Sequence, residues 1–176
     1  MSRLVWLIPL FPLLGTIVNA LFGRLIGHRA HWIAVPALGA SFLAACAVFA
    51  RVQGGETFTG DLFPWIAAGS FKTAIMLVVV TSVSLLVQVY SQGYMAGDGG
   101  YSRYFAYMSL FTASMLGLVL VDSILVLFVF WELVGLCSYL LIGFWFHRPA
   151  AARAAVKAFF PASDADCFWY QKPMSR

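Results

Sequence analysis

Five long runs of apolar residues constrain this chain more than any other feature of its sequence. They occupy residues 4–22, 32–50, 73–90, 104–121 and 123–146. An α-helix needs about 20 mainly apolar residues to cross a hydrocarbon core about 30 Å thick, and the last two runs together are too long for one crossing. We therefore predict an all-α fold, a polytopic membrane bundle of five transmembrane helices, with a turn at Asp122 between the fourth and fifth.

The composition excludes a soluble domain. Hydrophobic residues make up 62% of the chain, charged residues 10%, and the mean hydropathy is +0.88, whereas soluble domains have roughly 45–50% apolar and roughly 25% charged residues. Extended disorder is excluded as well, because disordered chains are poor in apolar residues. The three cysteines, Cys46, Cys137 and Cys167, lie far apart, and the sequence predicts neither a disulfide framework nor a metal site. The expected partner is the lipid bilayer, and no nucleic acid is expected.

The basic residues of the loops predict the orientation of the bundle. With five crossings, one side receives Arg24, Arg29, Arg103, Arg148, Arg153 and Lys157. The other side receives Arg3, Arg51 and Lys72, with Glu56 and Asp61 offsetting their charge. The first side is therefore expected to be cytoplasmic and the amino terminus to lie outside. In the outer connection, residues 57–63 are predicted to form a small hairpin of extended segments.

Glu132 is the strongest candidate for chemistry, because it lies about nine residues into the fifth predicted helix, near the bilayer midplane. A charge there costs roughly 2.5–3.5 kcal/mol, so the carboxyl needs a partner, water or a proton. Gly135 and Tyr139 share its helical face and Ser138 is nearby, which predicts an interior face. Asp122, Ser138 and Tyr139 are candidate pathway or supporting residues. The alternatives are a neutral structural Glu132 and an interfacial cap at Asp122.

Several segments resemble one known family. Residues 131–145 read WELVGLCSYLLIGFW and residues 147–159 read HRPAAARAAVKAF. They closely resemble the amino-terminal part of subunit L, or chain 5, of proton-pumping NADH:quinone oxidoreductase, respiratory complex I. Residues 8–12, 90–95 and 101–108 look like the same family, so that the resemblance covers residues 1–159.

The resemblance implies an antiporter-like subunit of the membrane arm, one proton channel of an enzyme that transfers electrons from NADH to quinone. Glu132 matches the family's intramembrane glutamate, which pairs with a lysine on a later helix. The resemblance implies no cofactor bound by this chain, since NADH and quinone are used elsewhere in the complex. It implies the other membrane-arm subunits as partners and the bacterial plasma (inner) membrane as the location.

The resemblance also divides the chain. Residues 1–103 would form three amino-terminal helices with the outer 51–72 loop, and residues 104–159 the first two helices of the antiporter-like repeat with a basic cytoplasmic segment. Residues 160–176 depart from the family and leave no room for a sixth span. We expect a frameshift or premature stop there, and hence a truncated antiporter-like subunit that is inactive alone.

Two other readings remain open. The first is the large subunit of a multisubunit sodium/proton antiporter, which has a similar buried glutamate but is expected to differ around residues 134–137. The second is a non-transporting membrane assembly protein, in which buried polar side chains only hold the helices together.

Overall fold

The computed structural model describes residues 2–54, 70–121, 123–145, 151 and 154–155. Its helices are α1 (Ser2–Ile26), the short 3-10 helix η1 (Gly27–Arg29), α2 (His31–Gln53), α3 (Ser70–Tyr94), α4 (Tyr101–Leu120) and α5 (Ile124–Ile142). The part of the chain that is described contains no strand, and each of the five α-helices is long and apolar enough to cross a membrane. The predicted all-α bundle of five spans is confirmed.

The ends of α5 show how local chemistry sets helix boundaries. Val121 and Ser123 are both extended, with ψ of 136° and 122°, which separates α4 from α5 as predicted. At the other end α5 stops at Ile142, four residues before the predicted limit of 146. The Gly143 N–H donates to the Tyr139 carbonyl at 2.9 Å, and the Phe144 N–H donates to the Leu141 carbonyl at 3.3 Å. This tightening of the last turn closes the helix.

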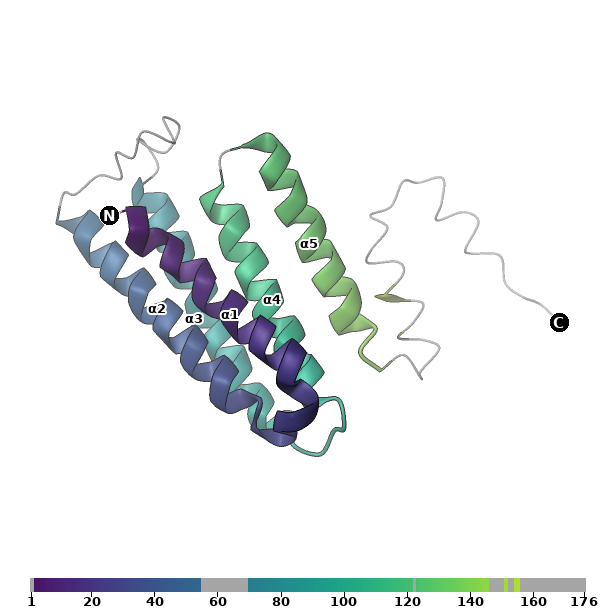
Figure 1. The fold of residues 1–176 in the computed structure, drawn as a ribbon. Coiled ribbons are helices and arrows are strands. Elements are labelled where there is room, and N and C mark those ends of the chain that lie inside the picture. The colour runs from purple at the N-terminus through teal and green to yellow at the C-terminus, as the bar shows by residue number, and fades with distance from the viewer. Residues whose placement is uncertain (1, 55–69, 122, 146–150, 152–153, 156–176) are drawn as a thin grey trace, which may run out of the picture.

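The five helices alternate in direction, and α1 to α4 pack together while α5 lies at the edge (Figure 1). Both α1 and α3 contact α2 and α4, whereas α5 contacts α4 alone among the described helices. One end of the bundle carries the start of α1 and the α4–α5 junction. The opposite end, called here the η1 end, carries η1, the α3–α4 connection and the end of α5.

Two apolar clusters hold the bundle together. The cluster near the amino-terminal end contains Ile8, Ala45, Val48, Ala74, Leu77, Leu116 and Leu120. The cluster at the η1 end contains Ala30, Ala34, Met95, Tyr101, Phe105 and Phe144. Between α3 and α4, the Gln88 amide donates to the Ser109 hydroxyl at 3.2 Å, and both side chains are buried. Such interhelical hydrogen bonds join helices where lipid offers no competing partner.

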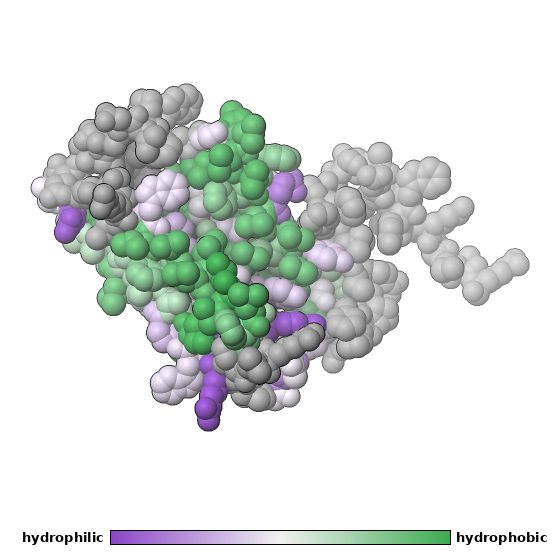
Figure 2. Space-filling model, in the orientation of Figure 1, coloured by the Kyte–Doolittle hydropathy of each residue, from purple (hydrophilic) through white to green (hydrophobic). Residues whose placement is uncertain are grey.

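The surface of the helices is strongly apolar (Figure 2). Large side chains such as Leu21, Leu43 and Leu86 are 71%, 69% and 70% exposed. Water would disfavour patches of this kind, whereas lipid solvates them. The exposed basic side chains lie at the ends, as the predicted topology requires: Arg29 and Arg103 at the η1 end, Arg51 and Lys72 at the other.

Some predictions fall outside the described residues. They are the hairpin at 57–63, the turn residue Asp122, most of the basic segment after α5, and the whole of residues 160–176.

Candidate functional site

Glu132 is the ninth of the 19 residues of α5. At a rise of 1.5 Å per residue it lies about 12 Å along the axis from Ile124 and about 15 Å from Ile142. No other aspartate or glutamate occurs within the five described helices. The carboxyl therefore sits close to the middle of its span, at the depth predicted from the sequence.

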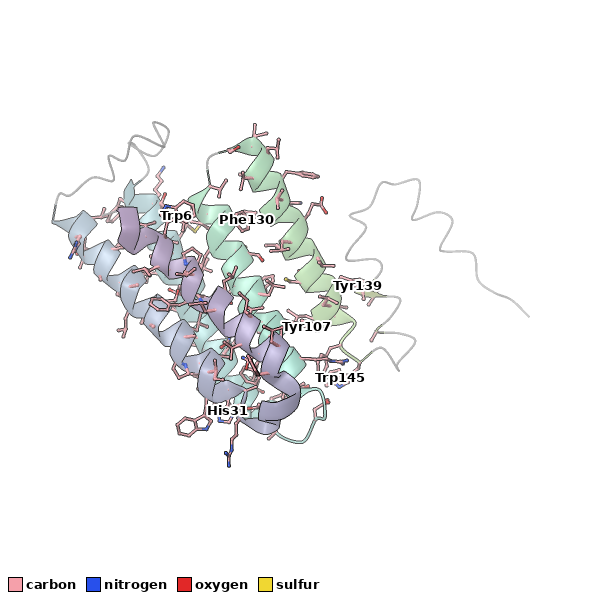
Figure 3. All side chains as sticks on the ribbon, viewed as in Figure 1. Trp6, His31, Tyr107, Phe130, Tyr139 and Trp145 are labelled. Carbon is pink, nitrogen blue, oxygen red and sulfur yellow. The ribbon has the colours of Figure 1, made fainter. Side chains whose placement is uncertain are left out.

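The face of α5 that packs on α4 is not the face of Glu132. Cys137 is fully buried and in contact with Ser114 of α4. The Phe130 ring packs against Gly117, where an added Cβ would overlap the ring (Figure 3). Glu132 precedes Cys137 by five residues, which turns it away by about 140° on a helical wheel, and its side chain is exposed.

None of the other four described helices covers the face of Glu132, so the expected interior face is not formed within these five helices. Gly117 is the physical reason, because the missing side chain leaves a recess that admits a ring, and the recess fixes the rotation of α5. Nothing lies within 4 Å of a Cβ built on Gly135. The face is open to lipid or to a helix outside the five, and the described residues supply Glu132 with no ion-pair partner.

The other predicted site residues separate in the structure. Tyr139 follows Glu132 by seven residues and shares its face, and its side chain is half-buried. Ser138 lies on another face, and its hydroxyl donates to the Val134 carbonyl of its own helix at 2.9 Å. Glu132 and Tyr139 thus share one face of α5, about 10 Å apart along the axis, whereas Ser138 does not share it.

A polar contact at the η1 end ties α5 to the α3–α4 connection. The Gly100 N–H donates to Asp98 Oδ1 at 3.0 Å, and the Trp145 indole N–H donates to Asp98 Oδ2 at 2.9 Å. The hydrogen bond from Gly100 has the larger effect and the bond from Trp145 the smaller, and both lower the pKa of Asp98 below its usual 3.8. Phe144 lies directly against Gly100, where a Cβ would come within 2.5 Å of the ring. We call Asp98, Gly100, Phe144 and Trp145 the α5 clasp.

A cavity of about 860 Å³ lies beside the clasp. Its walls include Asn19, Gly23, Asp98, Ser102, Arg103 and Tyr107. Sequence reasoning missed the clasp and the cavity. The signals present were an Asp-Gly-Gly turn and two aromatic residues directly after the fifth span, but nothing in the sequence pairs those segments. Among the described residues, no three His, Cys, Asp or Glu side chains gather to hold a metal ion.

Two family models match the chain. Residues 65–105 match the amino-terminal part of chain 5 of NADH-ubiquinone oxidoreductase (complex I), and residues 121–168 match the transmembrane domain of NADH:quinone oxidoreductases and Mrp antiporters. The chain belongs to the complex I chain 5 family. Glu132 and all of α5 lie within the second matched segment of this family, and Asp98 and Arg103 lie within the first.

Curated members of the chain 5 family align with most of the sequence. Chloroplastic NAD(P)H-quinone oxidoreductase subunit 5 of Mesostigma viride is 46% identical over 90% of this chain, and chain 5 of Synechocystis is 44% identical over 89%. F(420)H(2) dehydrogenase subunit L of Methanosarcina mazei is 43% identical over 94%. The alignments cover 27%, 26% and 26% of these relatives, so the chain spans about a quarter of their length.

The clasp yields a prediction for the end of α5. In Asp98→Asn the side-chain oxygen can still accept from the Gly100 N–H, but the NH₂ group then faces the Trp145 indole N–H, so that two donors meet. Trp145→Phe removes the indole donor. Each change should speed amide hydrogen exchange at residues 143–145 about threefold or more. In a double-mutant cycle the second change should add little to the first. Fully additive effects would show that the two side chains are not coupled.

Acid should open the same contact. Because the folded pKa of Asp98 lies below its usual 3.8, the clasp contributes its full stability above that pH and loses it as the pH falls through the lowered pKa. The protection factors of amides 143–145, which are exchange rates corrected for their intrinsic pH dependence, should therefore fall below about pH 4 in the wild type and stay flat in Asp98→Asn.

Proposed function

We propose that this chain acts in the membrane arm of a respiratory NADH:quinone oxidoreductase and carries one proton channel, in which Glu132 gains and loses the proton. The observation that carries this proposal is the isolated carboxyl in the middle of α5, exposed on the face that α4 does not cover. A carboxyl at that depth is retained at a cost, which is typical of proton pathways.

Proton exchange at Glu132 requires a neighbour that responds to its charge. A cation on another membrane helix would favour the carboxylate, and its departure would favour the protonated acid. The open face, which also carries Tyr139 two turns further along α5, has room for such a helix. A protonation change coupled to movement of the cation is then the elementary step of transport.

The proposed partners are the other membrane-arm subunits. The relatives are named for different electron donors, NAD(P)H and reduced F420, although their chain 5 or L subunits are similar to this chain. This supports a subunit that binds neither donor nor redox cofactor and receives the driving force through the complex. We place the amino terminus outside and the η1 end in the cytoplasm of a bacterial plasma membrane, on the distribution of Arg and Lys along the sequence.

A sodium/proton antiporter is the second candidate function, because the model matched by residues 121–168 describes both groups of proteins. In that role the same carboxyl would exchange protons for sodium, with no electron transfer. The third reading, an assembly protein, predicts no ion movement.

The three candidate functions can be distinguished in inverted membrane vesicles that contain the complex with this chain. Addition of NADH should drive proton uptake that stops when quinone reduction is inhibited and is unchanged when choline replaces sodium. Uptake that requires a sodium gradient but no electron donor would contradict the proposal in favour of the antiporter. Uptake that is unchanged in Glu132→Gln, at normal electron transfer, would favour the assembly role.

A further inference from the structure

The cavity at the η1 end has the size and position of a ligand site. Its volume of about 860 Å³ falls within the roughly 300–1,000 Å³ usual for bound small molecules. It lies between the end of α1, the start of α4 and the residues that follow α5. This inference is independent of the proton channel, since it concerns none of the residues proposed to carry it.

Two opposite charges line the cavity without forming an ion pair, although Arg103 lies close enough to contribute to the lowered pKa of Asp98. Arg103 is exposed and lies over the Phe144 ring at 5.7 Å, and it makes no ion pair with a described residue. Each oxygen of Asp98 accepts one hydrogen bond, from Gly100 or Trp145, and retains lone-pair capacity for another. The cavity thus offers a guanidinium to a phosphate and a carboxylate to an ammonium group.

The depth of these side chains matches the headgroup layer of a membrane. Arg103 is the third residue of α4, about 3 Å along the axis from its start, and Tyr107 is about 9 Å along. Trp145 stands just beyond α5 and is 43% exposed, as Trp and Tyr are at membrane–water interfaces. Basic pockets between helices at this level bind lipid headgroups.

Towards the membrane middle the cavity meets an apolar surface of α1. Ala20 lines the cavity and is exposed. Ile17 and Leu13 lie on the same face of α1, three and seven residues before it, and are 44% and 37% exposed. The apolar surface continues along the bundle in Figure 2. Acyl chains can lie along this surface while the headgroup occupies the cavity.

Asn19 adds a buried hydrogen-bond acceptor that has no donor among the described residues. It lines the cavity and is 2% exposed, and its amide nitrogen donates to the Ala30 carbonyl at 3.4 Å. Its Oδ1 has no hydrogen-bond partner, and a buried acceptor left unpaired is costly. We infer that this cavity binds one phospholipid with a phosphoethanolamine headgroup, its phosphate on Arg103 and its ammonium group towards Asp98 and Asn19.

The test uses the chain purified from membranes. It is reconstituted with equal amounts of phosphatidylethanolamine, phosphatidylcholine and phosphatidylglycerol. After extraction in mild detergent, native mass spectrometry should find one phosphatidylethanolamine retained per chain. Arg103→Gln should lower this retention about tenfold, equivalent to about 1.4 kcal/mol. Arg29→Gln is the matched control, because Arg29 is exposed at the same end but does not line the cavity.

A second pair of variants tests the cavity itself. Ala20→Phe should fill it and release the lipid without removing a charge, whereas Ala47→Phe, at an exposed position of α2, should have no effect. Equal loss in Arg29→Gln, equal retention of phosphatidylcholine, or displacement of the lipid by millimolar inorganic phosphate would each overturn the inference. Loss of the retained lipid when the chain is extracted within its assembled complex would show a protein segment in the cavity instead.

Discussion

Replacing Glu132 with Gln should abolish coupled proton translocation through this chain and leave the insertion of α5 intact. The amide has nearly the same shape as the carboxyl but cannot take up or release a proton. It also removes the charge, which costs roughly 2.5–3.5 kcal/mol at the midplane, so insertion should be no worse. In vesicles, the proton uptake that depends on this chain should fall at least tenfold, since loss of the titrating group stops the step rather than slowing it.

Ser138→Ala is the matched control on the same helix. The Ser138 hydroxyl donates within α5, to the Val134 carbonyl, so its removal should leave proton uptake within about twofold of the wild type. Unchanged uptake in Glu132→Gln, at normal levels of the assembled complex, would remove Glu132 from the pathway. A similar loss of proton uptake in Ser138→Ala would mean that the substitutions act by disturbing α5 and not by removing a proton-exchanging group.

Gly117→Leu should detach α5 from α4. A Cβ at this position overlaps three atoms of the Phe130 ring. The leucine side chain would therefore clash with a ring that is packed between α4 and α5. Overpacking of this kind typically costs about 1–3 kcal/mol, which is large for a helix that contacts no other described helix. Glu132 would move with α5, and we expect proton uptake to be lost together with the packing.

Crosslinking provides the measurement. Cys137 is buried in contact with Ser114, so a short thiol reagent should join Cys137 to the cysteine of Ser114→Cys in a background where Cys46 and Cys167 are changed to Ala. Gly117→Leu should abolish the crosslink, and Phe130→Ala should restore it by making room. Gly39→Leu is the control, because nothing lies within 4 Å of a Cβ at that helical glycine. A crosslink that persists in Gly117→Leu would show that the helices can accommodate the larger side chain.

The position of α5 illustrates the limit of sequence reasoning. The fifth apolar run predicted that this helix exists, and the extended residues Val121 and Ser123 lie where the turn before it was predicted. The run also suggested that the helix continues to residue 146, because Phe144 and Trp145 are as apolar as the residues before them. These two residues instead pack on Gly100 and bond Asp98, contacts that lie more than forty residues away in the chain.

By itself, the sequence determined that the chain crosses a membrane five times and that one carboxyl lies at the middle of the fifth crossing. Both depend on hydrophobic length, which is a property of consecutive residues and is the same whatever the helices touch. The tertiary structure alone decided which way that carboxyl faces and how the end of α5 is held. Those depend on the recess at Gly117 and on the pairing of Asp98 with Trp145, because rotation and contact are fixed by the shapes of two segments together.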